Sequence, residues 1–337
     1  MNSIQQQMNV LCSELGQDHL IVQGAGGNFS WKEEDVLWVK ASGTWLSQAL
    51  EKNIFVPVDL KEIQHKIAQN EFEITPTTLG QGALKPSIET ILHALMPQKF
   101  VAHLHPVDLV TLLIQADESW LKKLAQSTLL NNYLLLDYAQ PGIPLAKLLH
   151  DGLQNKKEAQ LILLKNHGIV YAADTLDALK AGLAELLNGF QQSPVLSSDQ
   201  EVSDAQQEIT INDQVYLRHP SDDLSQLVTN EVFFEMLEPY WALCPDHIVF
   251  LGAKAICFEK VSEIQFAVTE LPPLIFIKNV GIYLQPQWKL AQEMQLQFFY
   301  EVLRRLPKQT TISVLSNTEI GKLLNWDAET YRKNLMH

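Results

Sequence analysis

The stretch Phe100-Val101-Ala102-His103-Leu104-His105-Pro106 joins a short apolar run to two histidines at positions i and i+2. The run, closed by a proline, predicts a buried β-strand over residues 100–104. Side chains alternate between the faces of a strand, so His103 and His105 are expected on the same face. From there both can reach one ion at about 2.0–2.1 Å, and neutral imidazole suits zinc and other late transition metals. Taken alone, the motif fits two half-buried strand histidines equally well.

A third histidine follows another apolar run. Gln160 to Leu164 predicts a strand, and Lys165-Asn166-His167-Gly168 comes directly after it. His167 can therefore project from a strand end into a cleft. Three protein ligands leave one position open for substrate, as a catalytic metal site requires. Alone, His167 is better explained as a turn residue that bonds a carbonyl; together, His103, His105 and His167 are predicted to hold one divalent cation.

A carboxylate for acid/base chemistry is expected at Glu89. Pro86-Ser87-Ile88-Glu89 has the pattern of a helix start, because proline pre-sets the first turn and serine caps free N–H groups. Near a metal, a carboxylate can take a proton from a carbon whose neighbouring carbonyl the ion polarises. A glutamate in a first helical turn is otherwise a favourable contact with the helix dipole.

Two glycine-containing turns offer backbone N–H groups for an anion. They are Gly24-Ala25-Gly26-Gly27-Asn28 and Ser42-Gly43. Such groups hold phosphate or carboxylate oxygens, although a glycine-rich loop is more often an ordinary turn. No G-x-G-x-x-G follows a strand and no P-loop occurs, so neither turn indicates a nucleotide site of those kinds.

Composition limits the classes of function. The 337 residues are 46% hydrophobic and 19% charged, with a net charge of −14, which predicts a globular protein and argues against nucleic-acid or anionic-membrane partners. Three scattered cysteines without C-x-x-C indicate neither disulfides nor a thiolate metal site, and favour a reducing cytoplasm. The N-terminus lacks the pattern of a signal peptide, and no apolar run approaches the ~20 residues of a membrane helix.

The spacing of apolar residues predicts further elements. Helices are expected at residues 1–15, 61–69, about 175–191 and 287–305, and strands at 36–39, 169–171, 247–251 and 273–278. The serine-rich segment 193–208 is the predicted linker. The expected organisation is therefore a catalytic domain over residues 1–192, the linker over 193–208, and a C-terminal α/β extension over 209–337.

Taken together, the motifs resemble the class II aldolase/adducin family. The matching segments are Gly24 to Ser30, Val39-Lys40-Ala41-Ser42-Gly43, Pro86 to Glu89 with His93, Ala102 to Pro106, and Leu164 to Gly168. Their order and spacing match over roughly residues 1–190, and five ordered motifs are more specific than any single one. Two distal motifs, residues 245–251 and 324–332, resemble a longer subgroup with a C-terminal extension. We interpret Trp326-Asp327 as an anchor that packs the C-terminal segment onto the body.

The resemblance implies an α/β fold with three α/β/α layers and a central, mostly antiparallel sheet, plus a smaller C-terminal α/β segment. It implies that the three histidines bind a divalent metal, zinc first, with manganese or cobalt as alternatives, and that Glu89 transfers the proton. Asn28, Ser42, Gly43 and Ser87 would line a phosphate site. The implied reaction is lyase cleavage of a C–C bond in a small sugar phosphate or related hydroxy-carbonyl compound through a metal-stabilised enediolate. A homo-oligomer is also implied.

Departures from the family pattern keep other functions open. Ala25 and Ile88 stand where related aldolases often carry hydroxyl residues, which weakens the expected phosphate site. Family aldolases also use a tyrosine from a neighbouring subunit, and Tyr133 and Tyr138 lie in a plausible region. The same site serves epimerases, dehydratases and decarboxylases, and the adducin branch is a non-catalytic binding or scaffold protein.

Overall fold

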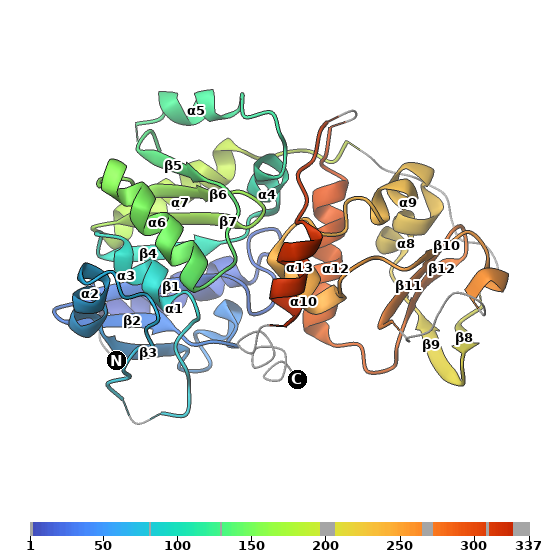
Figure 1. Cartoon of the computed structure of the whole chain (residues 1–337), viewed down its shortest axis with the longest axis horizontal. Helices are drawn as coiled ribbons and strands as arrows, with labels where there is room; N and C mark the ends of the chain where they lie inside the picture. The colour runs from blue at the N-terminus through green and yellow to red at the C-terminus, as the bar shows by residue number, and fades with distance from the viewer. Residues whose placement is uncertain are drawn as a thin grey trace.

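The computed structural model describes residues 3–80, 82–128, 130–195, 206–264, 272–307 and 310–325. Figure 1 shows two β-sheets, one in each half of the molecule, with helices α10, α12 and α13 between them. The elements before residue 195 are α1 (Ser3–Gly16), β1 (Asn28–Glu33), β2 (Val36–Lys40), η1 (Leu46–Gln48), β3 (Phe55–Asp59), α2 (Leu60–Ala68), α3 (Thr90–Leu95), β4 (Phe100–Leu104), α4 (Val107–Leu113), α5 (Leu121–Gln126), β5 (Tyr133–Leu136), α6 (Ile143–Asn155), β6 (Leu161–Leu164), β7 (Gly168–Ala173) and α7 (Leu176–Gly189).

The later elements surround the second sheet. They are β8 (Glu208–Ile211), β9 (Gln214–Arg218), α8 (Asp222–Thr229), α9 (Glu231–Leu237), α10 (Pro245–Leu251), β10 (Cys257–Phe258), η2 (Val261–Glu263), β11 (Leu274–Ile277), β12 (Gly281–Leu284), α12 (Leu290–Leu303) and α13 (Asn317–Leu324). The sheet has the order β10-β11-β12-β9-β8, and only β10 and β11 are parallel. No helix within the described ranges is long and apolar enough to cross a bilayer.

The first sheet has seven strands in the order β3-β2-β1-β4-β7-β6-β5. Every neighbouring pair is antiparallel except β5 and β6. The prediction of a mostly antiparallel sheet is therefore confirmed. Strand β4 is central, between β1 and β7, and it is the strand that the two-histidine motif predicts.

Helices cover both faces of this sheet, because its strands bury apolar side chains on both. Phe100, Ala102 and Leu104 of β4 join a core cluster with α1 and α7, whereas Val101 joins a cluster with α3 and α6. This alternation is the period-two pattern of a strand buried on both sides. The three-layer α/β/α arrangement is as expected. It also places His103, two residues after Val101, on the face covered by α3 and α6.

Most predicted elements are present, but one prediction is wrong. Residues 247–251 were expected to form a strand and instead belong to α10, which begins with Pro245. Every residue of α10 is buried, so the segment carries no polar face from which a helical period can be recognised. Trp326 and Asp327 lie outside the described residues, as do residues 196–205 of the predicted linker, and the division at residues 192 and 208 stays a prediction.

A shared hydrophobic core joins the two halves of the chain. Val107, Val110 and Ile114, in and just after α4, pack in one cluster with residues of α10, α12 and α13. Helix α4 directly follows His105 and Pro106. The later half of the chain is therefore packed against α4, the helix that follows the two-histidine motif.

His247 is an unusual member of this packing. It is fully buried, and its ring packs against Phe298 and Phe299 at centroid distances of 4.8 and 5.4 Å. Neither ring nitrogen has a hydrogen-bond partner among the described residues. Burial lowers the pKa of His247 from 6.5 to about 3, against the opposing effect of Asp246. The folded protein therefore holds this imidazole neutral, since a charge cannot be solvated there.

We predict that His247 weakens the fold in acid. Between the unfolded pKa of 6.5 and the folded pKa of about 3, the unfolded chain binds a proton that the folded chain does not. The free energy of unfolding should therefore fall by about 1.4 kcal/mol per pH unit as pH drops below 6.5, and be unaffected above it. Urea unfolding of His247→Leu against wild type between pH 4.5 and 7.5 measures this. The variant should lose that part of the slope, and the exposed control His65→Leu should keep it. Equal slopes in all three proteins would contradict the prediction.

Candidate metal centre and active site

Three histidine side chains converge at the end of the central strands. His103 lies on β4, His105 directly after it, and His167 in the turn that precedes β7. All three are buried, and one nitrogen from each lies within 4.8 Å of the others. The antiparallel pairing of β4 with β7 sets Leu104 opposite Ile169, so the two histidine segments end side by side. The sheet thus brings His167 next to His103 and His105, which lie more than 60 residues earlier in the chain.

The ring orientations suit a cation. The Nδ1 of His103 lies 2.8 Å from the carbonyl oxygen of Ile169, which accepts a hydrogen bond from an N–H at that position. In the neutral ring this leaves Nε2 as the acceptor, and Nε2 faces the Nε2 of His105 at 3.1 Å. Two imidazole nitrogens turned toward one another at this distance have the arrangement of a ligand pair. The three residues therefore fit a divalent metal by both chemistry and geometry.

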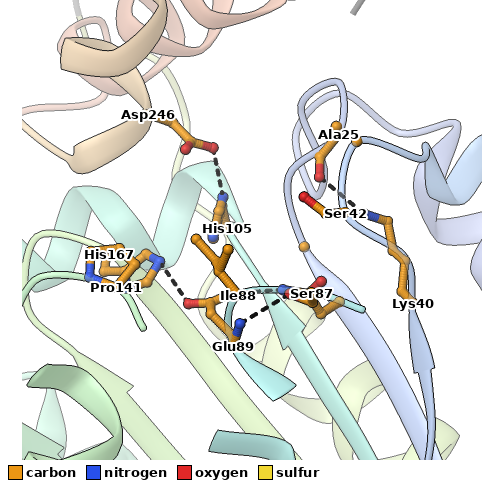
Figure 2. A pocket seen from close by; sticks show the side chains of 13 residues that line it. Ala25, Lys40, Ser42, Ser87, Ile88, Glu89, His105, Pro141, His167 and Asp246 are labelled. Atoms are coloured by element: carbon orange, nitrogen blue, oxygen red, sulfur yellow. Dashed lines mark hydrogen bonds and ion pairs between the residues drawn. The ribbon is translucent and has the colours of Figure 1, made fainter. Parts of the chain in front are cut away.

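Glu89 lies against the same histidines. Its Oε2 is 3.4 Å from Nε2 of His103. Its Oε1 is 3.6 Å from Nε2 of His167, a contact that Figure 2 shows. Glu89 is buried, and Oε1 accepts no hydrogen bond from the described residues. The residue occupies the N-cap position just before α3, one position earlier than the predicted first turn. A buried carboxylate oxygen aimed at imidazoles is arranged to meet a cation or a proton.

One pocket gathers almost the whole predicted set of site residues. It has a volume of about 410 Å³, its opening included. Of the predicted residues, it is lined by Asn28, Ser42, Gly43, Ser87, Glu89, His105 and His167. His103 does not line the pocket, but it contacts Glu89, His105 and His167, which do. Tyr133 and Tyr138 are not among the lining residues of this pocket. From the same part of the chain, Pro141 lines it.

Asn28 and Ser87 have local partners beside Glu89. The amide Nδ2 of Asn28 donates a hydrogen bond to Glu89 Oε2 at 2.6 Å, and the backbone N–H of Glu89 donates to Ser87 Oγ at 3.2 Å. Asn28 is the register partner of His103 in the β1–β4 pair, which is why its amide reaches this position. Asn28 therefore orients the carboxylate directly, whereas Ser87 holds the backbone of Glu89, and both residues line the pocket.

A buried lysine and a buried neutral histidine complete the surroundings. Lys40, at the end of β2, donates from Nζ to the carbonyl oxygen of Ala25 at 3.0 Å and lines the pocket. On α3, His93 pairs with Ser30 at 2.7 Å, and burial holds the pKa of His93 well below 6.5. Figure 2 shows Lys40 beside Ser42, on the wall of the pocket opposite His105 and His167.

Lys40 and Asp246 also line the pocket, and neither was predicted from the sequence as a site residue. Asp246 belongs to α10, far along the chain, and its Oδ2 lies 3.7 Å from Nδ1 of His105. It lies in the distal motif of residues 245–251, but nothing in that motif marks it as a site residue among 39 acidic residues. A lysine at the end of a strand that is otherwise apolar was a signal for Lys40, because lysine is almost never fully buried without a partner.

Known proteins match the first part of this chain. The family model described as Class II Aldolase and Adducin N-terminal domain matches residues 6–192. The curated protein "Uncharacterized oxidoreductase YuxG" of Bacillus subtilis (strain 168) is 30% identical over 177 residues, 48% of this chain. That match covers only 25% of YuxG, so the chain corresponds to about a quarter of that relative.

Solved structures show the same extent of similarity. The N-terminal class II aldolase domain of a conserved protein from Thermoplasma acidophilum is 24% identical with a TM-score of 0.46, covering 56% of this chain and 92% of that one. YgbL from Escherichia coli is 22% identical with a TM-score of 0.44, covering 55% of this chain and 86% of that one. These matches concern about half of this chain.

Gly168 is predicted to be required for the histidine arrangement. A Cβ on Gly168 would lie 2.4 Å from the carbonyl oxygen of Leu104 and 2.8 Å from Cδ2 of His105. Gly168→Ala should therefore push apart the ends of β4 and β7 and lower the free energy of unfolding by about 1–3 kcal/mol. Urea unfolding measures this. A Cβ on Gly321, inside α13, meets nothing within 4 Å, so the control Gly321→Ala should instead stabilise by about 0.4–1 kcal/mol. Similar effects of the two changes would contradict the steric argument.

Proposed function

Because the chain belongs to the class II aldolase and adducin family, we propose that it is a metal-dependent lyase. It cleaves a C–C bond of a small sugar phosphate or a related hydroxy-carbonyl compound. The observation that carries the proposal is the buried Glu89 carboxylate, 3.4 and 3.6 Å from the Nε2 atoms of two of three converging histidines. Glu89, His105 and His167 line one pocket with polar groups that suit an anionic substrate.

His103, His105 and His167 would hold the metal through ring nitrogens. A divalent ion bound there would polarise a substrate carbonyl and stabilise the negative charge that develops on its oxygen. Imidazole donors favour zinc, and manganese and cobalt are the alternatives. The Ile169 carbonyl fixes His103 in the tautomer that presents Nε2 to the pocket.

Glu89 moves the proton. In the cleavage direction Glu89 would accept the proton that the substrate hydroxyl releases as it becomes a carbonyl. As a carboxylic acid it would then donate that proton to the carbon freed by the broken C–C bond, and condensation reverses both transfers. The Asn28 amide, 2.6 Å from Oε2, holds one carboxylate oxygen in place, so that Oε1 is the atom left to face the reacting carbon. Burial keeps bulk water from exchanging the proton during this step.

The opposite wall of the pocket supports an anionic substrate. Ser42, the turn at Gly43, Ser87 and the buried Lys40 all line it. Hydroxyl and backbone N–H donors together with a lysine suit a phosphate or a carboxylate. Ala25 and Ile88 also line this pocket and supply no hydroxyl, so the anion is held by fewer donors than the family pattern provides. The cytoplasmic location and the homo-oligomer stay predictions.

We predict that wild-type protein binds about one divalent ion per chain, zinc before manganese or cobalt. His103→Ala should lose the ion, because it removes a buried ligand and leaves the other donors too few to compete with water. Elemental mass spectrometry of purified protein measures the metal content, with the exposed His65→Ala as control. A wild type that takes up no ion after incubation with zinc or manganese would contradict the proposal and favour a scaffold role.

We also predict that Glu89→Gln lowers the rate of retro-aldol cleavage by about 10²–10⁴-fold, because the amide cannot transfer the proton. The assay is product release from a panel of ketose phosphates, with Glu51→Gln, an exposed change, as control. Metal content should be retained in both variants. Cleavage that survives metal chelation would contradict the mechanism. Products without C–C cleavage would identify an epimerase or a dehydratase at the same site, and release of CO₂ would identify a decarboxylase.

A further inference from the structure

The C-terminal half of the chain supplies a carboxylate to the histidine cluster. Asp246 is buried and lines the same pocket as Glu89, with Oδ2 at 3.7 Å from Nδ1 of His105. Figure 2 shows Asp246 descending from the ribbon of α10 onto the His105 ring, on the side away from Glu89. The two carboxylates therefore approach the cluster from opposite sides, and their charges would balance that of one divalent ion.

The position of Asp246 matches the orientation of the His105 ring. Nε2 of His105 points into the cluster, 3.1 Å from Nε2 of His103, so its other nitrogen, Nδ1, points at Asp246. A carboxylate on the outer nitrogen favours the tautomer with the proton there, which leaves Nε2 as the ligand and makes it more basic. His103 has the Ile169 carbonyl in the equivalent place. The two neighbouring ligands are thus oriented by different groups, one from each half of the chain.

The glycine loop leaves room for this contact. A Cβ on Gly26 would lie 3.2 Å from Nδ1 of His105 and 3.5 Å from Oδ2 of Asp246. Any larger residue would therefore stand beside the two atoms that face each other. The loop that the sequence indicates as an anion-binding turn also shapes the meeting point of His105 and Asp246.

The side chain of Asn166 forms hydrogen bonds to the segment just before α10. Asn166, which immediately precedes His167, donates from Nδ2 to the carbonyl oxygens of Leu243 at 2.9 Å and Ser313 at 2.8 Å. Asn166 has a φ of +54°, a left-handed conformation that asparagine tolerates, and this conformation aims its amide at the later segment. Leu243 lies three residues before Asp246, so this contact fixes the segment close to the carboxylate.

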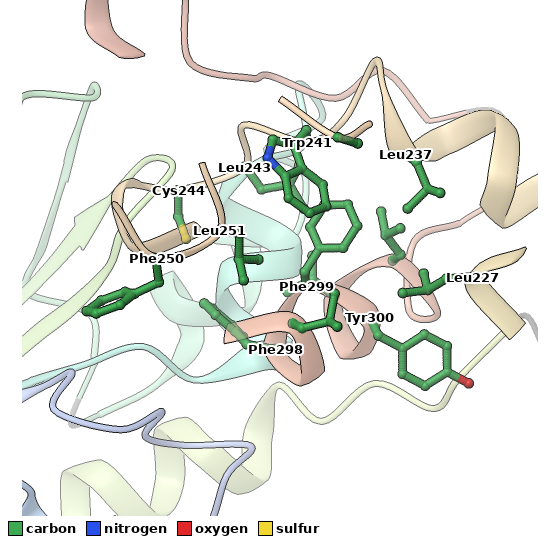
Figure 3. Packing of buried hydrophobic residues seen from close by; sticks show 14 of the residues in the cluster. Leu227, Leu237, Trp241, Leu243, Cys244, Phe250, Leu251, Phe298, Phe299 and Tyr300 are labelled. Atoms are coloured by element: carbon green, nitrogen blue, oxygen red, sulfur yellow. The ribbon is translucent and has the colours of Figure 1, made fainter. Parts of the chain in front are cut away.

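Further contacts hold the C-terminal segment on α4. Arg305 pairs with Asp108 of α4 at 2.9 Å, and the backbone of Ser313 donates to the Ile114 carbonyl at 2.7 Å. Figure 3 shows Phe298 and Phe299 of α12 packed close to Leu251 of α10. Helix α10 therefore rests on a fully buried core and is anchored to the segment that carries His105.

We propose that Asp246 is a positioning residue of the metal centre, which orients His105 and increases its strength as a ligand. The inference rests on the proposed metal-dependent function. It assigns the C-terminal segment a direct part in that centre: within a single chain, α10 completes the surroundings of a site whose ligands all precede residue 168. Removing the Asp246 charge should weaken metal binding without removing a ligand.

The test is the affinity for Zn²⁺ alone, measured by competition with a chromophoric chelator on full-length protein. Asp246→Asn keeps the shape of the side chain and removes its charge, and should bind Zn²⁺ about 10–100-fold more weakly than wild type. Asp246→Glu retains the carboxylate and should recover most of the affinity. The matched control is Asp213→Asn, in the exposed β8–β9 turn of the same segment, where a φ of +64° suits asparagine. The control should bind like wild type.

Two further measurements separate positioning from folding. The visible spectrum of Co²⁺-loaded protein should change in Asp246→Asn, because the orientation of a ligand changes. Thermal unfolding of the metal-free proteins should show that the variants are folded. If Asp246→Asn is unfolded, Asp246→Ser replaces it as the variant without the charge. Its Zn²⁺ affinity and Co²⁺ spectrum are then compared with those of wild type and Asp246→Glu. Equal Zn²⁺ affinity and equal Co²⁺ spectra in wild type and the charge-removing variant overturn this inference alone. A wild type that binds no ion overturns the proposed function as well.

Discussion

The Nε2 atoms of His103 and His105 face each other at 3.1 Å in a buried space that also holds the Glu89 carboxylate. Groups of this kind are stable together only when a cation or shared protons lie among them, since each carries lone pairs that water no longer solvates. Much of the surrounding structure is arranged to keep them there. The central strands supply the histidines, the turn before α3 supplies Glu89, and the amide of Asn28 holds one oxygen of the carboxylate.

Small residues at the strand ends make this approach possible. Gly168 allows the carbonyl of Leu104 and the ring of His105 to lie where a methyl group would otherwise stand, and Gly26 does the same between His105 and Asp246. Close packing leaves no room for relaxation at these points, because both neighbours include backbone or ring atoms. The glycines are therefore part of the geometry of the site, independently of any anion that their N–H groups bind.

The later half of the chain is not an independent appendage. Asn166, Arg305 and the shared core fix α10 against the first sheet, and Asp246 enters the pocket as a result. This arrangement also buries His247, the neighbour of Asp246, among aromatic rings, where its pKa is lowered to about 3. The short helix that brings Asp246 to the histidine cluster therefore also contains an imidazole without hydrogen-bond partners among the described residues.

The sequence by itself indicated four strands of the first sheet, β2, β4, β6 and β7, together with a group of residues for a candidate site, whereas β1, β3 and β5 were not predicted. Alternation on β4 and the order of the motifs indicated His103, His105, His167 and Glu89 as one group. This was possible because strand periodicity and ligand type are local properties of the chain. The prediction was wrong at α10, where uniform burial removes the helical pattern. The motif of residues 245–251 includes Asp246, but the sequence did not indicate that this residue belongs to the site. Only the tertiary structure decided that Asp246 meets His105, and that Lys40 lines the same pocket. Those contacts join residues far apart in the chain, and they depend on how helices pack rather than on any local preference of the chain.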